Sequence, residues 1–168
     1  MIKFQHSKKA GFSLIELLVY IAIIAAMMTL VINILLSSSK SYNDLKLSRN
    51  INNSAITSLE RMTREIKASD YIDISNSVFD ANPGRLTVKN ATTTSEFYLD
   101  GNTLKVKENG IHAGALTHNE ASVDNLVFRT ADNGTSKGVK IEMTLSSSYR
   151  NLSKTKKFYS FGVLRNSY

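Results

Sequence analysis

The pattern of hydrophobic and polar residues begins with a long apolar run near the amino terminus of this 168-residue chain. From Leu17 to Leu36 the sequence carries no charged residue. As an α-helix with a rise of about 1.5 Å per residue, this run would be roughly 30 Å long, close to the hydrocarbon thickness of a bilayer. The pattern therefore predicts a helix over residues 12–36 that can span a membrane.

A second apolar pattern follows, and it has helical spacing. Apolar residues recur every three or four positions, at Leu47, Ile51, Ala55, Leu59, Met62 and Ile66. This spacing predicts an amphipathic helix over 37–69 whose apolar face packs on a core. Because no proline or glycine lies between Phe12 and Val78, we expect one continuous helix of about 55 residues. The alternative is two helices joined at Ser37–Ser39.

After Ala68 the pattern changes to strands and turns. The clearest pair of strands flanks Asp100-Gly101-Asn102, which is typical of a β-hairpin turn. Residues 109–122, with two glycines, are expected to form a loop. The expected strands are Arg85–Lys89, Glu96–Leu99, Thr103–Lys107, Val123–Thr130, Gly138–Leu145 and Lys157–Leu164. One long helix followed by an antiparallel sheet is an α+β arrangement.

The residues before the apolar run are unusual for a plain membrane anchor. Lys8 and Lys9 lead directly into Gly11 and Phe12, and Glu16 lies about one helical turn inside the apolar segment. An unpaired carboxylate at mid-bilayer depth costs about 3 kcal/mol. The sequence therefore allows two environments for Glu16. It is held at the headgroup level, where the positive end of the helix dipole favours it, or it pairs with a cation from elsewhere.

The sequence Lys8-Lys9-Ala10-Gly11, followed by Phe12-Ser-Leu-Ile-Glu16, resembles the prepilin leader of the type IV pilin superfamily. The resemblance implies that prepilin peptidase cuts between Gly11 and Phe12 and then N-methylates Phe12. It also implies the pilin fold, in which a long amino-terminal helix packs on an antiparallel sheet. In the implied filament, Glu16 pairs with the Phe12 amine of a neighbouring subunit.

In the carboxy-terminal half, the resemblance is to minor pseudopilins of the J class and their type IV pilus counterparts. It rests on Leu116-Thr117, on Val123–Phe128 and on the closing segment Phe158–Asn166. The implied partners are prepilin peptidase, other pilin-like subunits, an inner-membrane platform protein, an assembly ATPase and, before assembly, membrane lipid. The implied organisation is a leader at 1–11, a membrane and filament-core helix at 12–36, its amphipathic continuation at 37–69 and a β-rich domain at 70–168.

The amino terminus also has two alternatives to a prepilin leader. A secretory signal peptide cleaved near Ser37–Ser39 is disfavoured, because its apolar core would be only about 7–15 residues long. A plain single-pass anchor would be oriented by Lys3, Lys8 and Lys9, which favour a cytoplasmic amino terminus. That anchor and the pilin-like interpretation both place the chain in a bacterial inner membrane, with residues 37 onward outside the cytoplasm.

Composition and charge change this picture little. The absence of cysteine excludes a disulfide framework, so an exported domain must be stabilised by packing. The formal charge of +7 falls to +4 without residues 1–11, because three lysines leave and 18 basic residues remain against 14 acidic ones. The densest basic run, Lys154–Lys157 before Phe158 and Tyr159, fits either a nucleic-acid surface or a solvated strand flank.

Candidate chemistry is sparse. No nucleophile elbow, phosphate loop, zinc signature or paired-carboxylate motif occurs, so we predict no enzyme, no metal site and no cofactor. His112, His118 and Glu120 lie in one region but lack the spacing of a metal site. The sequence therefore predicts a minor pilin or pseudopilin of a type IV pilus, type II secretion or DNA-uptake filament. The alternatives are a single-pass anchored binding module that does not polymerise, and a DNA-binding minor pilin of a competence system.

Overall fold

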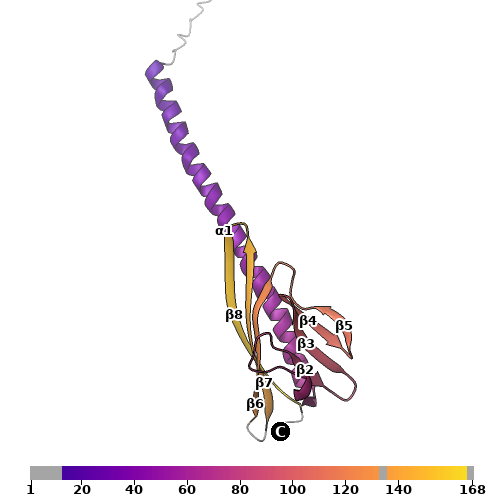
Figure 1. Ribbon diagram of the computed structural model, residues 1–168. Coiled ribbons are helices and arrows are strands. Elements are labelled where there is room, and N and C mark those ends of the chain that lie inside the picture. The colour runs from indigo at the N-terminus through magenta and orange to yellow at the C-terminus, as the bar shows by residue number, and fades with distance from the viewer. Residues whose placement is uncertain (1–12, 133–135, 166–168) are drawn as a thin grey trace, which may run out of the picture. The chain divides into compact units, whose positions relative to one another are not determined.

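The computed structural model describes residues 13–132 and 136–165, and it begins with one long α-helix. Helix α1 comprises Leu14–Ala68, so the expected single helix is present and Ser37–Ser39 lie inside it. The chain divides after Tyr42 into two compact units. Residues 14–42 of α1 belong to the first unit. Residues 43–68 belong to the second, together with every strand that the described residues form (Figure 1).

The described part of the second unit contains two antiparallel sheets. The first has the strand order β1-β2-β3-β4-β5, and the second has the order β6-β7-β8. The bounds are Tyr71–Ile72 for β1, Ile74–Asn76 for the 3-10 helix η1, Leu86–Lys89 for β2, Thr94–Asp100 for β3, Thr103–Glu108 for β4, Ile111–Ala115 for β5, Ser122–Asp132 for β6, Lys137–Tyr149 for β7 and Leu152–Val163 for β8. The α+β arrangement expected for a pilin fold is confirmed, with two sheets in place of one.

Strands β3 and β4 form the expected hairpin, and β5 extends it. Gly101 occupies the turn of the hairpin with a φ of 59°, a left-handed conformation that favours glycine. The expected loop over residues 109–122 is wrong for Ile111–Ala115, which pair with β4 at the edge of the sheet. All five residues of β5 are exposed. Since no side chain of this strand is buried, no large apolar residues mark a core-facing side, and Gly114 within it is typical of a loop.

Strands β7 and β8 are longer than expected and pair along their whole length. The expected last strand began at Lys157, but β8 begins five residues earlier. The lysines of this stretch obscure the strand in the sequence, because their hydrogen-bond partners lie on α1, about one hundred residues earlier in the chain. The Lys154 Nζ donates to Asp44 Oδ2 at 2.7 Å, and the Lys156 Nζ donates to Asn52 Oδ1 at 3.1 Å. Figure 1 shows β8 running beside the carboxy-terminal half of α1.

The segment between η1 and β2 connects the two sheets. The Gly84 amide donates to the Leu126 carbonyl at 2.8 Å, and the Asp80 amide donates to the Phe128 carbonyl at 2.9 Å. In return, the side-chain oxygen of Asn82 accepts a hydrogen bond from the Leu126 amide at 2.9 Å. A Cβ at position 84 would lie 2.9 Å from the Leu126 carbonyl oxygen, so this close approach requires glycine.

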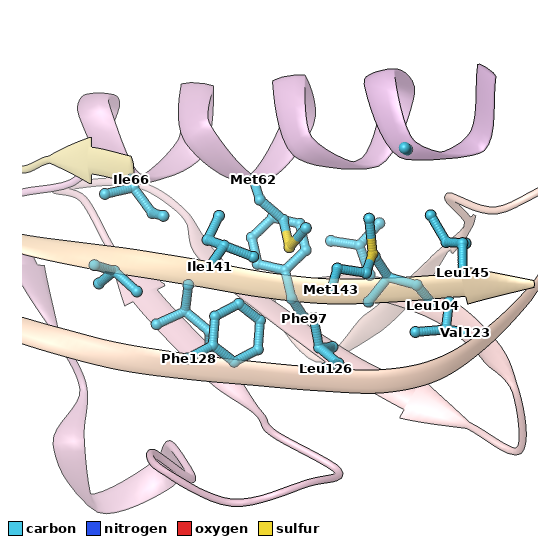
Figure 2. Close-up of a cluster of buried hydrophobic side chains, with 14 of the residues drawn as sticks. Met62, Ile66, Phe97, Leu104, Val123, Leu126, Phe128, Ile141, Met143 and Leu145 are labelled. Atoms are coloured by element: carbon cyan, nitrogen blue, oxygen red, sulfur yellow. The ribbon is translucent and has the colours of Figure 1, made fainter. Parts of the chain in front are cut away.

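Helix α1 and both sheets bury their apolar side chains in one core. Figure 2 shows Met62 and Ile66 pointing from α1 toward side chains of the strands, among them Phe97 and Ile141. The buried cluster contains Ile51, Ala55, Met62, Ile66, Leu86, Val88, Phe97, Leu104, Val106, Ala121, Val123, Leu126, Phe128, Val139, Ile141, Met143, Leu145 and Leu164. Because all three elements contribute to the same cluster, none of them has a separate core.

A small polar cluster holds β1, η1 and β2 together. The Lys89 Nζ lies 2.6 Å from Asp73 Oδ2, and Asn76 donates backbone and side-chain hydrogen bonds to the same carboxylate. The hydrogen bond from Lys89, and then that from Asn76, lower the pKa of Asp73 from 3.8 to about 2. The ionised carboxylate therefore stabilises the folded chain fully above a pH of 3.8, and this contribution is lost as the pH falls through about 2.

We expect Asp73→Asn to reduce the loss of stability between a pH of 3.8 and about 2, because the group that must take up a proton is gone. Thermal unfolding of the full chain in detergent, followed by circular dichroism across this range, measures the effect. Asp124→Asn is the control, since Asp124 is exposed and has no ion pair within the described residues. Equal acid sensitivity of Asp73→Asn and the native chain would contradict a stabilising role of the Asp73–Lys89 pair.

Candidate membrane and assembly segment

The first candidate site is the start of α1, around Glu16. Ser13 immediately precedes the helix, and its carbonyl accepts a hydrogen bond from the Leu17 amide at 3.2 Å. Ser13 and Glu16 have the Ser-x-x-Glu spacing that is typical of a helix start. Glu16 also lies in the first turn, where the helix dipole favours an anion. Local sequence therefore explains a carboxylate at this position, but not its place beside a long apolar run.

The Glu16 carboxylate is exposed. Within residues 13–132 and 136–165, no side chain forms a hydrogen bond or an ion pair with it. An ionised carboxylate only accepts hydrogen bonds, so a partner in an apolar environment must be a donor or a cation. The predicted leader residues Lys8 and Lys9 and the predicted cleavage residues Gly11 and Phe12 lie outside the described residues. Their relation to Glu16 stays a prediction.

The apolar run of α1 is uncovered in the described chain. Every residue from Leu14 to Tyr42 is exposed, and the exposed fractions of Leu14 and Leu36 are 77% and 66%. By length and composition, this helix is able to cross a membrane. Burying one large apolar side chain is worth about 1.5–3 kcal/mol, so a continuous apolar surface of this length is unfavourable in water. The run fits single-pass membrane anchoring.

Two polar residues within the apolar run differ in their hydrogen bonding. The Thr29 hydroxyl donates to the Ala25 carbonyl at 3.0 Å, so its hydrogen bond is satisfied inside the helix in any apolar environment. Asn33 is exposed, and no other described residue forms a hydrogen bond with its side chain. Asn33 therefore resembles Glu16 in requiring a partner from outside the described residues when the helix lies in lipid or protein.

The predicted packing face of α1 lies in the second unit. Its members Leu47, Ile51, Ala55, Met62 and Ile66 are exposed by 2% or less. Leu59 differs, because it is half-buried at the border of the core and lines a groove beside α1.

Two buried serines complete this face, and the apolar pattern missed them. The Ser58 hydroxyl donates to the Leu116 carbonyl at 3.1 Å, and the Ser54 hydroxyl accepts from the His118 amide at 3.0 Å. Their exposed fractions are 3% for Ser54 and 0% for Ser58. These small side chains let the loop over 116–118 approach the helix closely. Small residues four positions apart beside Ala55 are the signal that could have identified them.

His112 and His118, the two histidines of the region without metal-site spacing, form hydrogen bonds with different partners. His112 Nδ1 and the Tyr98 hydroxyl are 2.8 Å apart. His118 Nδ1 accepts a hydrogen bond from the Glu120 amide at 3.4 Å. In the part of the chain that the structure describes, no three His, Cys, Asp or Glu side chains are grouped so that they could hold a metal ion.

Comparison with protein families gives one finding, at the amino terminus. A family model described as the prokaryotic N-terminal methylation motif matches residues 6–32. Comparison with curated proteins and with solved structures gave no match. The matched residues include the basic pair, the Gly11-Phe12 junction, Glu16 and most of the apolar run. The match ends before the second unit, so inferences about that unit rest on its own structure.

Proposed function

We propose that this chain, which carries the type IV pilin-like prepilin motif at residues 6–32, is a minor pilin or pseudopilin. In this role it is a structural subunit of a type IV pilus, type II secretion or DNA-uptake filament. One observation carries the proposal: the motif runs directly into an uncovered apolar helix. Such a surface is stable in lipid before assembly and in a core of packed helices afterwards. The resemblance of residues 116–117, 123–128 and 158–166 to minor pseudopilins of the J class makes that class the finer proposal.

Before assembly, residues 12–36 anchor the chain as a single pass in the bacterial inner membrane. Lys8 and Lys9 favour a cytoplasmic amino terminus. Prepilin peptidase would therefore meet the leader at 1–11 on the cytoplasmic side, cut after Gly11 and methylate the new amine of Phe12. An assembly ATPase, acting through a platform protein, would then move the subunit from lipid into the filament. The second unit, residues 43–168, stays outside the cytoplasm.

Inside the filament, Glu16 pairs with the Phe12 amine of a neighbouring subunit. Two observations support this role: the carboxylate has no partner within the described residues, and it adjoins a long apolar surface that is exposed in the described chain. A singly methylated amine keeps its positive charge and donates hydrogen bonds, as the partner of a carboxylate must. In a core of low dielectric constant, either charge left alone is strongly unfavourable. The pair therefore sets the register of neighbouring helices.

Cleavage at Gly11 is the step that tests this function most directly. We expect Gly11→Val to leave the precursor intact in the membrane, because a branched side chain before the scissile bond obstructs access to the backbone. Intact-mass spectrometry of the native protein should show a chain that begins at N-methylated Phe12. Ser7→Val is the matched control, since it places the same side chain in the leader at a distance from the cut, and we expect it to be processed normally.

An unprocessed Met1 terminus in cells with an active prepilin peptidase would contradict the proposal. It would favour the second candidate, a single-pass anchored binding module that does not polymerise. The observation that favours this module is that the second unit buries a complete core of its own. Contact with DNA is less well supported, because Lys154 and Lys156 of the basic run bind side chains of α1.

A further inference from the structure

Among the residues that the structure describes, no strand pairs with one edge of β8. In an antiparallel ladder, residue pairs that exchange two backbone hydrogen bonds alternate with pairs that exchange none. Because the Leu164 amide donates to the Lys137 carbonyl at 3.0 Å, the odd-numbered residues from Ser153 to Val163 direct their amides and carbonyls away from β7. Within residues 13–132 and 136–165, no backbone group pairs with that edge. Figure 1 shows β8 as the outer strand of its sheet.

The two halves of this edge differ in charge. The first half contains three lysines between positions 154 and 157, and lysine on an edge strand opposes pairing with another strand. The second half, Phe158–Val163, carries no charge. Its outward-facing side chains include Tyr159, which is 62% exposed, and Phe161, which is 50% exposed. An uncharged edge with exposed aromatic residues is a ready template for one more strand.

A groove of about 870 Å³ lies beside this uncharged half of β8, along the last turns of α1. Ile56 and Leu59 form apolar parts of its helical wall. The Thr63 and Ser160 hydroxyl oxygens are 3.0 Å apart and join the helix to the strand within the groove. An edge strand with a helix beside it can hold an extended peptide, because the strand supplies backbone hydrogen bonds and the helix supplies side-chain contacts.

Cations are in excess along the groove. Among the described residues that line it, Arg64, Lys67 and Arg165 are accompanied by a single carboxylate, that of Glu60. Within the described residues, none of the three cations has an ion pair. A cation in the last turn also complements the helix dipole, which accounts for Lys67. It does not account for Arg165, which lies outside the helix and is held by a hydrogen bond from its amide to the Ser69 carbonyl at 3.3 Å.

We propose that this groove binds an extended, acidic peptide segment of a partner protein. The segment adds as a strand to Tyr159–Val163 of β8, and its carboxylates contact Arg64, Lys67 and Arg165. The free edge explains why the partner must be extended, and the excess of cations explains why it must be acidic. This binding is independent of the amino-terminal motif and does not require the chain to polymerise.

A display library of random peptides of about ten residues, long enough to cover the edge of one strand, tests the proposal. The library is selected on the full chain in lipid nanodiscs and counter-selected on the Tyr159→Pro variant. Proline at this outward-facing position removes an amide from the free edge without removing a hydrogen bond to β7. We expect the enriched peptides to alternate apolar and polar residues and to carry Asp or Glu at one end. Enrichment without an excess of acidic residues would overturn the proposal.

The strongest peptide is then synthesised in a plain form and in a form N-methylated at alternate residues, and binding is measured by fluorescence anisotropy. We expect the N-methylated peptide to lose binding to the native chain. Arg165→Glu should weaken binding of the plain peptide about tenfold, because a charge-assisted hydrogen bond is lost. Thr155→Pro, a matched proline outside the groove, should leave the affinity for the plain peptide unchanged. Equal binding of both peptide forms, or of Tyr159→Pro and the native chain, would overturn the proposal. The proposal would also be overturned if the native chain formed dimers that are absent from the Tyr159→Pro variant, because the groove would then bind a second copy of the chain.

Discussion

Replacement of Glu16 by alanine should leave the chain cleaved at Gly11 and held in the membrane, but should prevent its entry into filaments. In a filament core, this variant leaves the Phe12 amine of a neighbour without its anion. Removing one partner of a buried ion pair costs about 3–5 kcal/mol. Since about 1.4 kcal/mol corresponds to a factor of ten, we expect incorporation to fall by about two to four orders of magnitude. Immunoblots of membrane and sheared filament fractions from a complemented deletion strain measure it.

Two further variants separate the charge of Glu16 from its other properties. Glu16→Gln keeps the size of the side chain and its place at the helix start but removes the charge, so we expect it to fail like Glu16→Ala. Glu16→Asp keeps the charge with a shorter reach and should be partly impaired. If Glu16→Ala assembles like the native chain, the carboxylate is a tolerated interfacial residue. The role of Glu16 would then be limited to the Ser-x-x-Glu helix start, which contributes about 1 kcal/mol.

The second large effect is expected for Met62→Asp, which should unfold the second unit. Met62 is 0% exposed. Burying an unpaired carboxylate there costs several kcal/mol, in addition to about 1.5–3 kcal/mol from the lost apolar side chain, against a typical total stability of about 5–15 kcal/mol. Limited proteolysis and circular dichroism of the full chain in detergent measure the loss of structure.

Two positions on the same helix provide a graded control for Met62→Asp. Ile56 is 55% exposed, so Ile56→Asp introduces the same charge without burying it and should leave the unit folded. Leu59 is half-buried, and we expect Leu59→Asp to lie between the two. A folded and protease-resistant Met62→Asp variant would show that the face from Leu47 to Ile66 does not support the core.

The fold was predictable from the sequence where the local pattern and the final environment agree. Five of the six apolar residues with helical spacing from Leu47 to Ile66 are buried on α1, and Asp100-Gly101-Asn102 includes the hairpin turn. Prediction failed where the environment is set by distant residues. Strand β5 buries none of its side chains, so contacts with the core do not determine its residue types. The start of β8 was missed because the polar partners of its lysines lie about one hundred residues earlier in the chain.

Some residues of the candidate sites were also predictable from local sequence, whereas others were not. The prepilin-like junction is a local motif, so the sequence alone identified it, and the match over residues 6–32 covers the same residues. The buried serines of α1 escaped prediction because a polar side chain on an apolar face can be recognised only with its partner loop in place. The groove beside β8 also escaped prediction, since Arg64 and Lys67 on α1 and Arg165, which follows β8, are about one hundred residues apart in the sequence.

The contacts between α1 and β8 also constrain the order in which the second unit can be completed. Asp44, Asn52 and Thr63 find their partners 110, 104 and 97 residues later in the chain. Synthesis proceeds from the amino terminus, so α1 emerges long before the last strand exists. Contacts of such large sequence separation form late and slow the closure of a domain. A nascent chain therefore carries α1 with one flank uncovered until β8 has been synthesised and can pair with it.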